Sequence, residues 1–124
     1  MELIFCYNAR KGVINGIIDF FHKSISPATY SCNLCSITHT YKKNERWKKF
    51  INNYKLKISF IYIDDLKREN LNEFKHEIPC CFIKKDKVYK ILIDKKTINN
   101  LRNENELISL IRSIKISLFL QKFL

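Results

Sequence analysis

Two cysteines lie three positions apart in the stretch PATYSCNLCSITH, which covers residues 27–39. Cys32 and Cys35 form a Cys-x-x-Cys motif, with Pro27 before it and His39 after it. Two thiols at this spacing serve as a redox pair, as half of a metal site, or as buried side chains that happen to be neighbours. Each of these three uses makes different demands on the residues around the motif.

A redox pair needs one exposed thiol that ionises easily and a second thiol within one helical turn that resolves the mixed disulfide. If the motif begins a helix, the helix dipole favours the thiolate of Cys32. We expect Cys32 to be exposed and to attack protein thiols or disulfides, and Cys35 to be shielded and to resolve, with no cofactor. His22 or Lys23 would favour the thiolate further if a helix over 13–25 folded over the motif.

A metal site is the alternative use of the same thiols. Zinc in proteins prefers four cysteine and histidine ligands, arranged as a tetrahedron. The candidate ligands are Cys32, Cys35, His39 and His22. Cys80 or Cys81 would replace one of these ligands if the fold brought it to the motif, but the chain lacks a second tightly spaced pair. A zinc-binding or partner-binding module without catalysis therefore stays open.

The other three cysteines have a simpler interpretation. Cys6 lies in an apolar run and is expected to be a small core residue. Cys80 and Cys81 are adjacent, and because neighbouring side chains of a strand point to opposite faces, at most one of them can face the motif. The pair Cys32 and Cys35 would itself be inert if both thiols were only packing residues.

A formal net charge of +11 makes nucleic acid a third and weaker candidate partner. Only five of the 23 basic residues are Arg, the residue that base readout and bidentate phosphate contacts favour. A solvated surface explains most of the lysines. The test is whether six lysines gather on one face beside exposed aromatic rings, namely Lys42, Lys43, Lys48, Lys49, Lys55 and Lys57.

Length and composition favour one ordered domain over residues 1–124. Hydrophobic residues make up 46% of the chain, and Gly and Pro number two each, which argues against a disordered chain. The apolar runs are too short for a membrane span, and the start MELIFCYNAR does not resemble a secretory signal. We expect a cytoplasmic protein in which the cysteines are not a disulfide framework; the oligomeric state stays open.

The pattern of apolar residues predicts an alternation of strands and helices. Apolar residues at steps of three and four indicate helices, and β-branched and aromatic runs indicate strands. Asn103 and Glu106 form a variant of a capping box at the start of the last helix. The predicted elements are a strand over 2–9, a helix over 13–25, a helix over 47–54, a central strand over 57–64, a short polar helix over 66–77, a hairpin over 77–94 and a long terminal helix.

This order predicts an α/β fold with a mixed sheet of about four strands and helices on both faces. A Cys-x-x-Cys ahead of a helix and a strand, followed by Ile78-Pro79 at the start of a hairpin, resembles the thioredoxin fold, a three-layer sandwich. The resemblance implies a cis-proline beside the cysteine pair, and Pro79 is the candidate. It also implies thiol–disulfide oxidoreductase activity.

Three features differ from the usual thioredoxin pattern, and the first is that no Trp precedes the cysteines. Asn33 and Leu34 replace Gly-Pro between the cysteines, and residues 10–31 form an insertion with a helix before the motif. The segments YNA, HK and P-x-T-Y-x-C-x-L-C, with the Trp47 that follows, also resemble a group of short bacterial Cys-x-x-Cys proteins. That second resemblance implies no particular activity.

Overall fold

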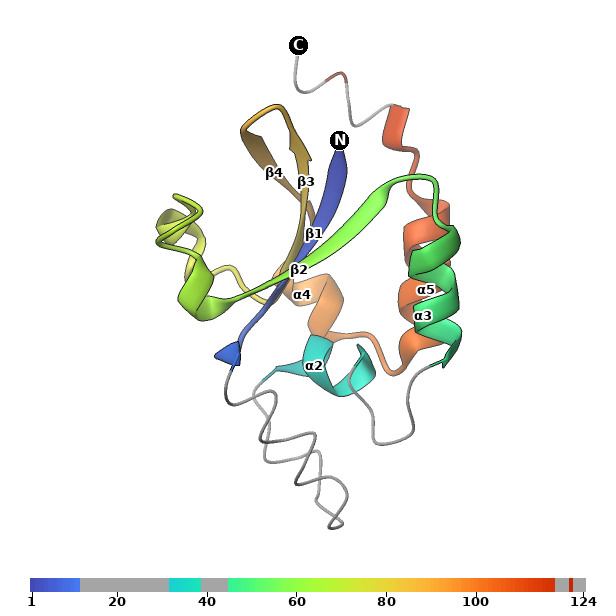
Figure 1. Cartoon of the computed structure of the whole chain (residues 1–124). Coiled ribbons are helices and arrows are strands. Elements are labelled where there is room, and N and C mark those ends of the chain that lie inside the picture. Colours follow the sequence, from blue (N-terminus) through green and yellow to red (C-terminus); the bar gives the residue numbers. More distant parts are fainter. Residues whose placement is uncertain (12–31, 39–44, 118–120, 122–124) are drawn as a thin grey trace.

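A computed structural model describes residues 1–11, 32–38, 45–117 and 121. The predicted helix over 13–25 lies outside these residues. The described part is built on a mixed sheet in the order β2-β1-β3-β4 (Figure 1). Its strands are β1 (Glu2–Tyr7), β2 (Lys57–Tyr62), β3 (Cys80–Lys85) and β4 (Val88–Ile93). The predicted α/β class with a mixed four-stranded sheet is thus confirmed.

Strand β1 is the most deeply buried strand, with five consecutive buried residues from Leu3 to Tyr7. It pairs parallel with β2 and antiparallel with β3, so that Phe5 lies between Phe60 and Cys81. Strand β2 is therefore an edge strand, and the prediction that it is central was wrong. Its apolar run looks like that of a buried strand, but its side chains from Ile58 to Tyr62 are only half-buried.

Strands β3 and β4 form the predicted hairpin, with Lys85 paired to Val88. The turn between them contains Asp86 at a φ of 51°. Asp is one of the few residues other than Gly that adopt this left-handed region readily. The residue type at position 86 is therefore compatible with the tight turn that the pairing of Lys85 with Val88 requires.

Within the described residues, four α-helices pack on one face of the sheet (Figure 1). They are α2 (Asn33–Thr38), α3 (Glu45–Asn53), α4 (Lys95–Asn99) and α5 (Glu104–Ser113). Side chains from all four join Leu3, Phe5 and Tyr7 of β1 in one hydrophobic cluster. Phe5 contacts Trp47 of α3 edge to face, with ring centroids 5.6 Å apart.

In the described part of the chain, the opposite face of the sheet is covered by turns and short 3-10 helices. The expectation of helices on both faces stays a prediction, because the predicted helix over 13–25 lies outside the described residues. The segment predicted as a helix over 66–77 contains the 3-10 helix η3 (Asn72–Phe74) and follows another, η2 (Ile63–Asp65). Leu66 and Leu71 are both buried, yet residues five apart do not share one face of an α-helix. Burying both leucines therefore requires a break, and Asn70 has a φ of 61° there.

Helices α4 and α5 both begin with a side-chain cap. The Thr97 N–H donates to the carboxylate of Asp94 at 2.9 Å, and the Glu106 N–H donates to the amide oxygen of Asn103 at 3.0 Å. The cap at Asn103 was predicted, whereas α4 was missed. Helix α5 ends at Ser113 after ten residues, and most of the last seven residues of the predicted long terminal helix lie outside the described residues.

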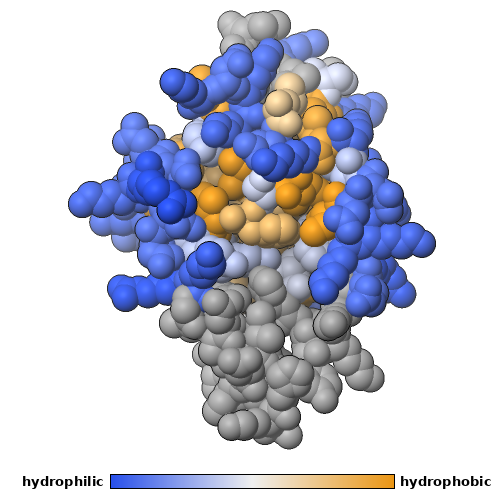
Figure 2. All heavy atoms as spheres, in the orientation of Figure 1, coloured by the Kyte–Doolittle hydropathy of each residue, from blue (hydrophilic) through white to orange (hydrophobic). Residues whose placement is uncertain are grey.

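Half-buried side chains of β2 leave apolar surface on one face of the molecule. Figure 2 shows this surface gathered over β2 and framed by hydrophilic side chains. Within the described ranges, we find no helix with the length and apolar character needed to cross a membrane.

We expect Asn103→Ala to lower the free energy of unfolding by about 1 kcal/mol, because the Glu106 N–H loses its acceptor at the start of α5. Urea unfolding followed by circular dichroism measures the change. Asn52→Ala is the matched control, since it removes the same amide from an exposed position within α3. Equal destabilisation by the two substitutions would contradict a capping role.

Candidate functional site

The Cys-x-x-Cys motif lies at the start of α2, as the sequence predicts. Helix α2 begins at Asn33, directly after Cys32, and Cys35 lies in its first turn. The two sulfurs are joined in a disulfide, with the Cα atoms 5.3 Å apart. The two cysteines are therefore at the backbone separation that a disulfide requires.

Two backbone N–H groups converge on the sulfur of Cys32. The N–H of Cys35 donates to it at 3.3 Å from within α2, and the N–H of Asn8 donates to it at 3.3 Å from the end of β1. Donors aimed at a sulfur stabilise the charged form of a thiol over the neutral form. The sulfur of Cys32 therefore accepts two backbone hydrogen bonds in the disulfide form of the pair.

Both cysteines of the pair are buried, which corrects the expectation of an exposed Cys32 beside a shielded Cys35. Each has an exposed fraction of 1%. Cys32 and Cys35 belong to the same hydrophobic cluster as Tyr7, and the backbone at Asn8 reaches the sulfur of Cys32 directly. Because the motif packs against the sheet, Cys32 is no more exposed than Cys35, although its position at the start of a helix alone suggests that it would be.

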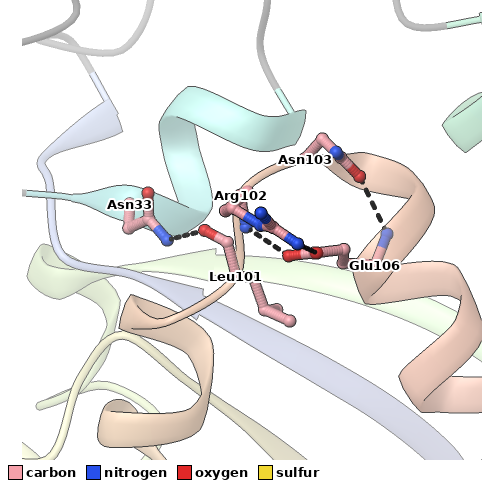
Figure 3. A network of polar contacts seen from close by, with 5 residues as sticks. All are labelled: Asn33, Leu101, Arg102, Asn103 and Glu106. Carbon is pink, nitrogen blue, oxygen red and sulfur yellow. Dashed lines mark hydrogen bonds and ion pairs between the residues drawn. The ribbon is translucent and has the colours of Figure 1, made fainter.

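Asn33 joins the cysteine pair to the rest of the helical layer. Its side-chain N–H₂ donates to the carbonyl oxygen of Leu101 at 2.8 Å, just after the end of α4 (Figure 3). It also donates to the carbonyl oxygen of Ile98 in α4, at 2.8 Å. The residue after Leu101 is held in turn, because the backbone N–H of Arg102 donates to the carboxylate of Glu106 at 2.7 Å. The sequence indicated only that Asn33 and Leu34 replace Gly-Pro between the cysteines, and the spacing of Asn33 gave no signal for this contact.

The other end of α2 is anchored on β1. The Thr38 hydroxyl donates to the carbonyl of Leu34 at 2.7 Å, so its single proton is used within the helix. The Tyr7 hydroxyl, 3.0 Å from the Thr38 oxygen, is then the donor of that hydrogen bond. Burial raises the pKa of Tyr7 above its usual value, which keeps this donor protonated.

Pro79 lies at the start of β3, in the buried interior. The Ile78–Pro79 peptide bond is cis. In the β1–β3 register Cys80 is opposite Cys6, and continuing the register by one residue places Pro79 across from Tyr7. Pro79 and Asn8, the donor to Cys32, are therefore at the same end of the sheet.

The three remaining cysteines are buried within the sheet and are free thiols. Cys81 belongs to the cluster of the cysteine pair, whereas Cys6 and Cys80 belong to the cluster on the other face. The prediction that Cys80 and Cys81 face opposite sides is thus confirmed. Burial, with a smaller effect of Asp65, raises the pKa of Cys6 to about 12. Burial also raises the pKa values of Cys80 and Cys81, so all three stay protonated near neutral pH.

The residues proposed for a zinc site are only partly described. His22 and His39 lie outside the described residues, as does Lys23, the other group proposed to favour the thiolate. Among the residues that the structure describes, no group of three or more His, Cys, Asp or Glu side chains is placed to hold a metal ion. The zinc alternative stays a prediction from the sequence.

Comparison with known proteins does not assign the chain to a family. No protein-family model matches the chain, and searches of curated proteins and of solved structures find no significant match. The resemblance to the thioredoxin fold therefore stays a prediction that rests on the motif and on the arrangement around it.

We expect Asn33→Ala to destabilise the fold by about 1–3 kcal/mol, because the carbonyls of Ile98 and Leu101 lose a shared donor in a partly buried position. Urea unfolding of the oxidised protein measures this change. Asn53→Ala is the control, since that amide also donates to a backbone carbonyl, at Lys49, but on the exposed surface. A loss in Asn33→Ala no larger than in Asn53→Ala would contradict a structural role for Asn33.

The buried thiols predict a fall of stability in alkaline solution. In the unfolded chain Cys6 ionises near the ordinary thiol pKa of 9.0, whereas in the folded chain it ionises only at about 12. The stabilisation that the protonated Cys6 thiol contributes is therefore fully present below pH 9. As the pH rises from 9 toward 12, ionisation of this thiol in the unfolded chain lowers the free energy of unfolding by up to about 1.4 kcal/mol per pH unit. Urea unfolding of the wild type and of Cys6→Ala at several pH values measures the slope.

Cys6→Ala should lower stability at pH 7 through the lost packing, yet its stability should fall less steeply above pH 9 than that of the wild type. Parallel pH profiles for the two proteins would show that ionisation of Cys6 does not contribute to the alkaline loss.

Proposed function

We propose that the protein is a thiol–disulfide oxidoreductase in which Cys32 is the attacking thiol and Cys35 the resolving thiol. The observation that carries the proposal is the convergence of the Asn8 and Cys35 N–H groups on the sulfur of Cys32, next to its disulfide partner. The three other cysteines have raised pKa values, and none of them belongs to a Cys-x-x-Cys motif. Under this proposal, Cys32 is the one cysteine of the chain that attacks a partner.

The reaction exchanges one disulfide for another. The Cys32 thiolate attacks a disulfide of a partner protein, a mixed disulfide forms, and the partner's first sulfur leaves as a thiolate that takes up a proton. Cys35 then loses its proton and attacks the sulfur of Cys32. The Cys32–Cys35 disulfide forms and the partner's second sulfur leaves, so the partner is reduced by two electrons and the cysteine pair is oxidised.

The arrangement around the motif supports the resemblance to the thioredoxin fold. The cysteine pair follows β1 in sequence, β1 lies parallel to β2, and the hairpin β3–β4 joins the sheet antiparallel at the other edge of β1. A cis-proline begins that hairpin at the end of the sheet where Asn8 meets Cys32. Pro79 is proposed to shape the surface on which a partner's disulfide rests.

Burial of both sulfurs sets a condition on this chemistry. A partner's disulfide has to reach Cys32 in line with the bond that breaks, and an exposed fraction of 1% does not allow this. We therefore infer that the backbone around the motif opens before exchange. Absolute rates of modification will then be slow, but their pH dependence still reports the pKa of the attacking thiol.

The test is alkylation of the reduced protein by iodoacetamide over a range of pH. In a Cys6→Ala/Cys80→Ala/Cys81→Ala background, the rate at Cys32 should show an apparent pKa below the ordinary thiol value of 9.0, because two N–H donors stabilise the thiolate. Mass spectrometry of the modified peptides separates Cys32 from Cys35. An ordinary or raised pKa at Cys32 would overturn the proposed activation.

Trapping of partners separates the two roles. In an extract with intact disulfides, Cys35→Ser should accumulate mixed disulfides through Cys32, whereas Cys32→Ser, the matched control, should not. Equal trapping by both variants, or none by either, would contradict an attacking and a resolving thiol.

The zinc alternative predicts instead about one equivalent of metal in the reduced protein and a lower melting temperature after chelation.

A further inference from the structure

A groove runs between α3 and α5, with a volume of about 770 Å³. We call it the α3–α5 groove. Helix α3 lines one side and helix α5 the other, and the polar residues of each recur at helical spacing. These residues are Arg46, Lys49, Asn53, Asn105, Ser109 and Arg112. Each helix therefore presents a continuous stripe of hydrogen-bond donors to the same space.

Positive charge dominates this space. Four cationic side chains line the groove, and no Asp or Glu is among the described residues that do so. Arg46 forms an ion pair with Glu104 at 3.8 Å, and the Arg46 side chain is 62% exposed. The positive potential of the groove therefore comes mainly from three cations that share one concave surface, Lys49, Lys55 and Arg112. Such a surface favours the binding of an anion.

The floor of the groove is apolar. Phe50, Ile108 and Ile111 form it, with Tyr54 against Phe50 at a centroid distance of 5.2 Å. The guanidinium of Arg112 lies over the Phe50 ring, 5.4 Å from its centroid. This contact orients a cation at the boundary between the floor and the wall. A ligand on this floor has apolar side chains beneath it and cations within reach of its end.

We propose that the α3–α5 groove binds a small organic anion, in which an aromatic or acyl body carries a carboxylate or phosphate. The body packs on Phe50, Tyr54 and Ile108, and the anionic group lies among Lys49, Lys55 and Arg112. The volume is within the range of small-molecule sites, roughly 300–1,000 Å³. Helix α2 does not line the groove, so this site is separate from the cysteine pair.

Two fluorescent probes that differ in one charged group test the proposal. The aromatic sulfonate 1-anilinonaphthalene-8-sulfonate has both an apolar body and an anion, and N-phenyl-1-naphthylamine is its neutral counterpart. The wild type should bind the sulfonate with saturation at one site and at least roughly fivefold more tightly than the neutral probe. Equal affinity for the two probes would overturn the role of the cations.

Adjacent lysines of α3 provide a matched pair of variants. Lys49 lines the groove, whereas Lys48, also exposed on α3, does not. Lys49→Gln should weaken the sulfonate roughly fivefold and leave the neutral probe unchanged, and Lys48→Gln should change neither. Ser109→Phe, at an exposed position on the wall, should block both probes by filling the groove. Equal effects of the two lysine substitutions would place the probe elsewhere and overturn the proposal.

Displacement of the sulfonate identifies the chemistry of the ligand. Phenyl phosphate or octanoate should displace it, whereas inorganic phosphate and octanol should do so at least roughly tenfold less well, because each lacks half of the required chemistry. The stronger of the two competitors distinguishes an aromatic phosphate from an acyl carboxylate. Stronger displacement by a single-stranded oligonucleotide than by either would assign the groove to nucleic acid and overturn the small-ligand proposal.

Discussion

Strand β1 is the constraint on which the rest of the molecule depends. It has a hydrogen-bonded neighbour on each edge and a hydrophobic cluster on each face. Leu3, Phe5 and Tyr7 hold the helical layer, and Ile4 and Cys6 hold the turns on the other face. The end of the same strand supplies the Asn8 N–H to the sulfur of Cys32 and the Tyr7 hydroxyl to Thr38. The core and the candidate site are therefore one packed unit, and a change that shifts β1 will move the cysteine pair.

The five cysteines show how environment decides the chemistry of one residue type. Cys6, Cys80 and Cys81 are buried in the sheet, where loss of hydration disfavours their charged form. Cys32 is buried to the same extent, but two N–H groups point at its sulfur, and such donors offset the loss of hydration for a thiolate. The environment proposed to activate Cys32 therefore differs from that of the sheet thiols in its two N–H donors and not in its burial. Cys81 has a backbone donor at Ile4, and burial still raises its pKa.

Sequence patterns predicted those elements whose signals are local. The hairpin over β3 and β4 and the cap of α5 at Asn103 depend on residues close in sequence, and both are observed. The polar helix over 66–77 was wrong, because the long-range burial of Leu66 and Leu71 outweighed helix propensity in a short segment. The short helix α4 was missed, although Asp94 and Thr97 carried a usable capping signal. Strand β2 was placed at the centre because an apolar run does not record which neighbour covers it.

The sequence by itself determined the α/β class, the spacing of Cys32 and Cys35 at a helix start, and the opposite faces of Cys80 and Cys81, because each follows from the repeat of a helix or a strand. Only the tertiary structure decided that both cysteines of the pair are buried, that Asn33 donates to Ile98 and Leu101, and that Asn8 donates to Cys32. These contacts join residues between 24 and 68 positions apart. No local periodicity encodes them, since they arise only when the packing of the helical layer on β1 brings the segments together.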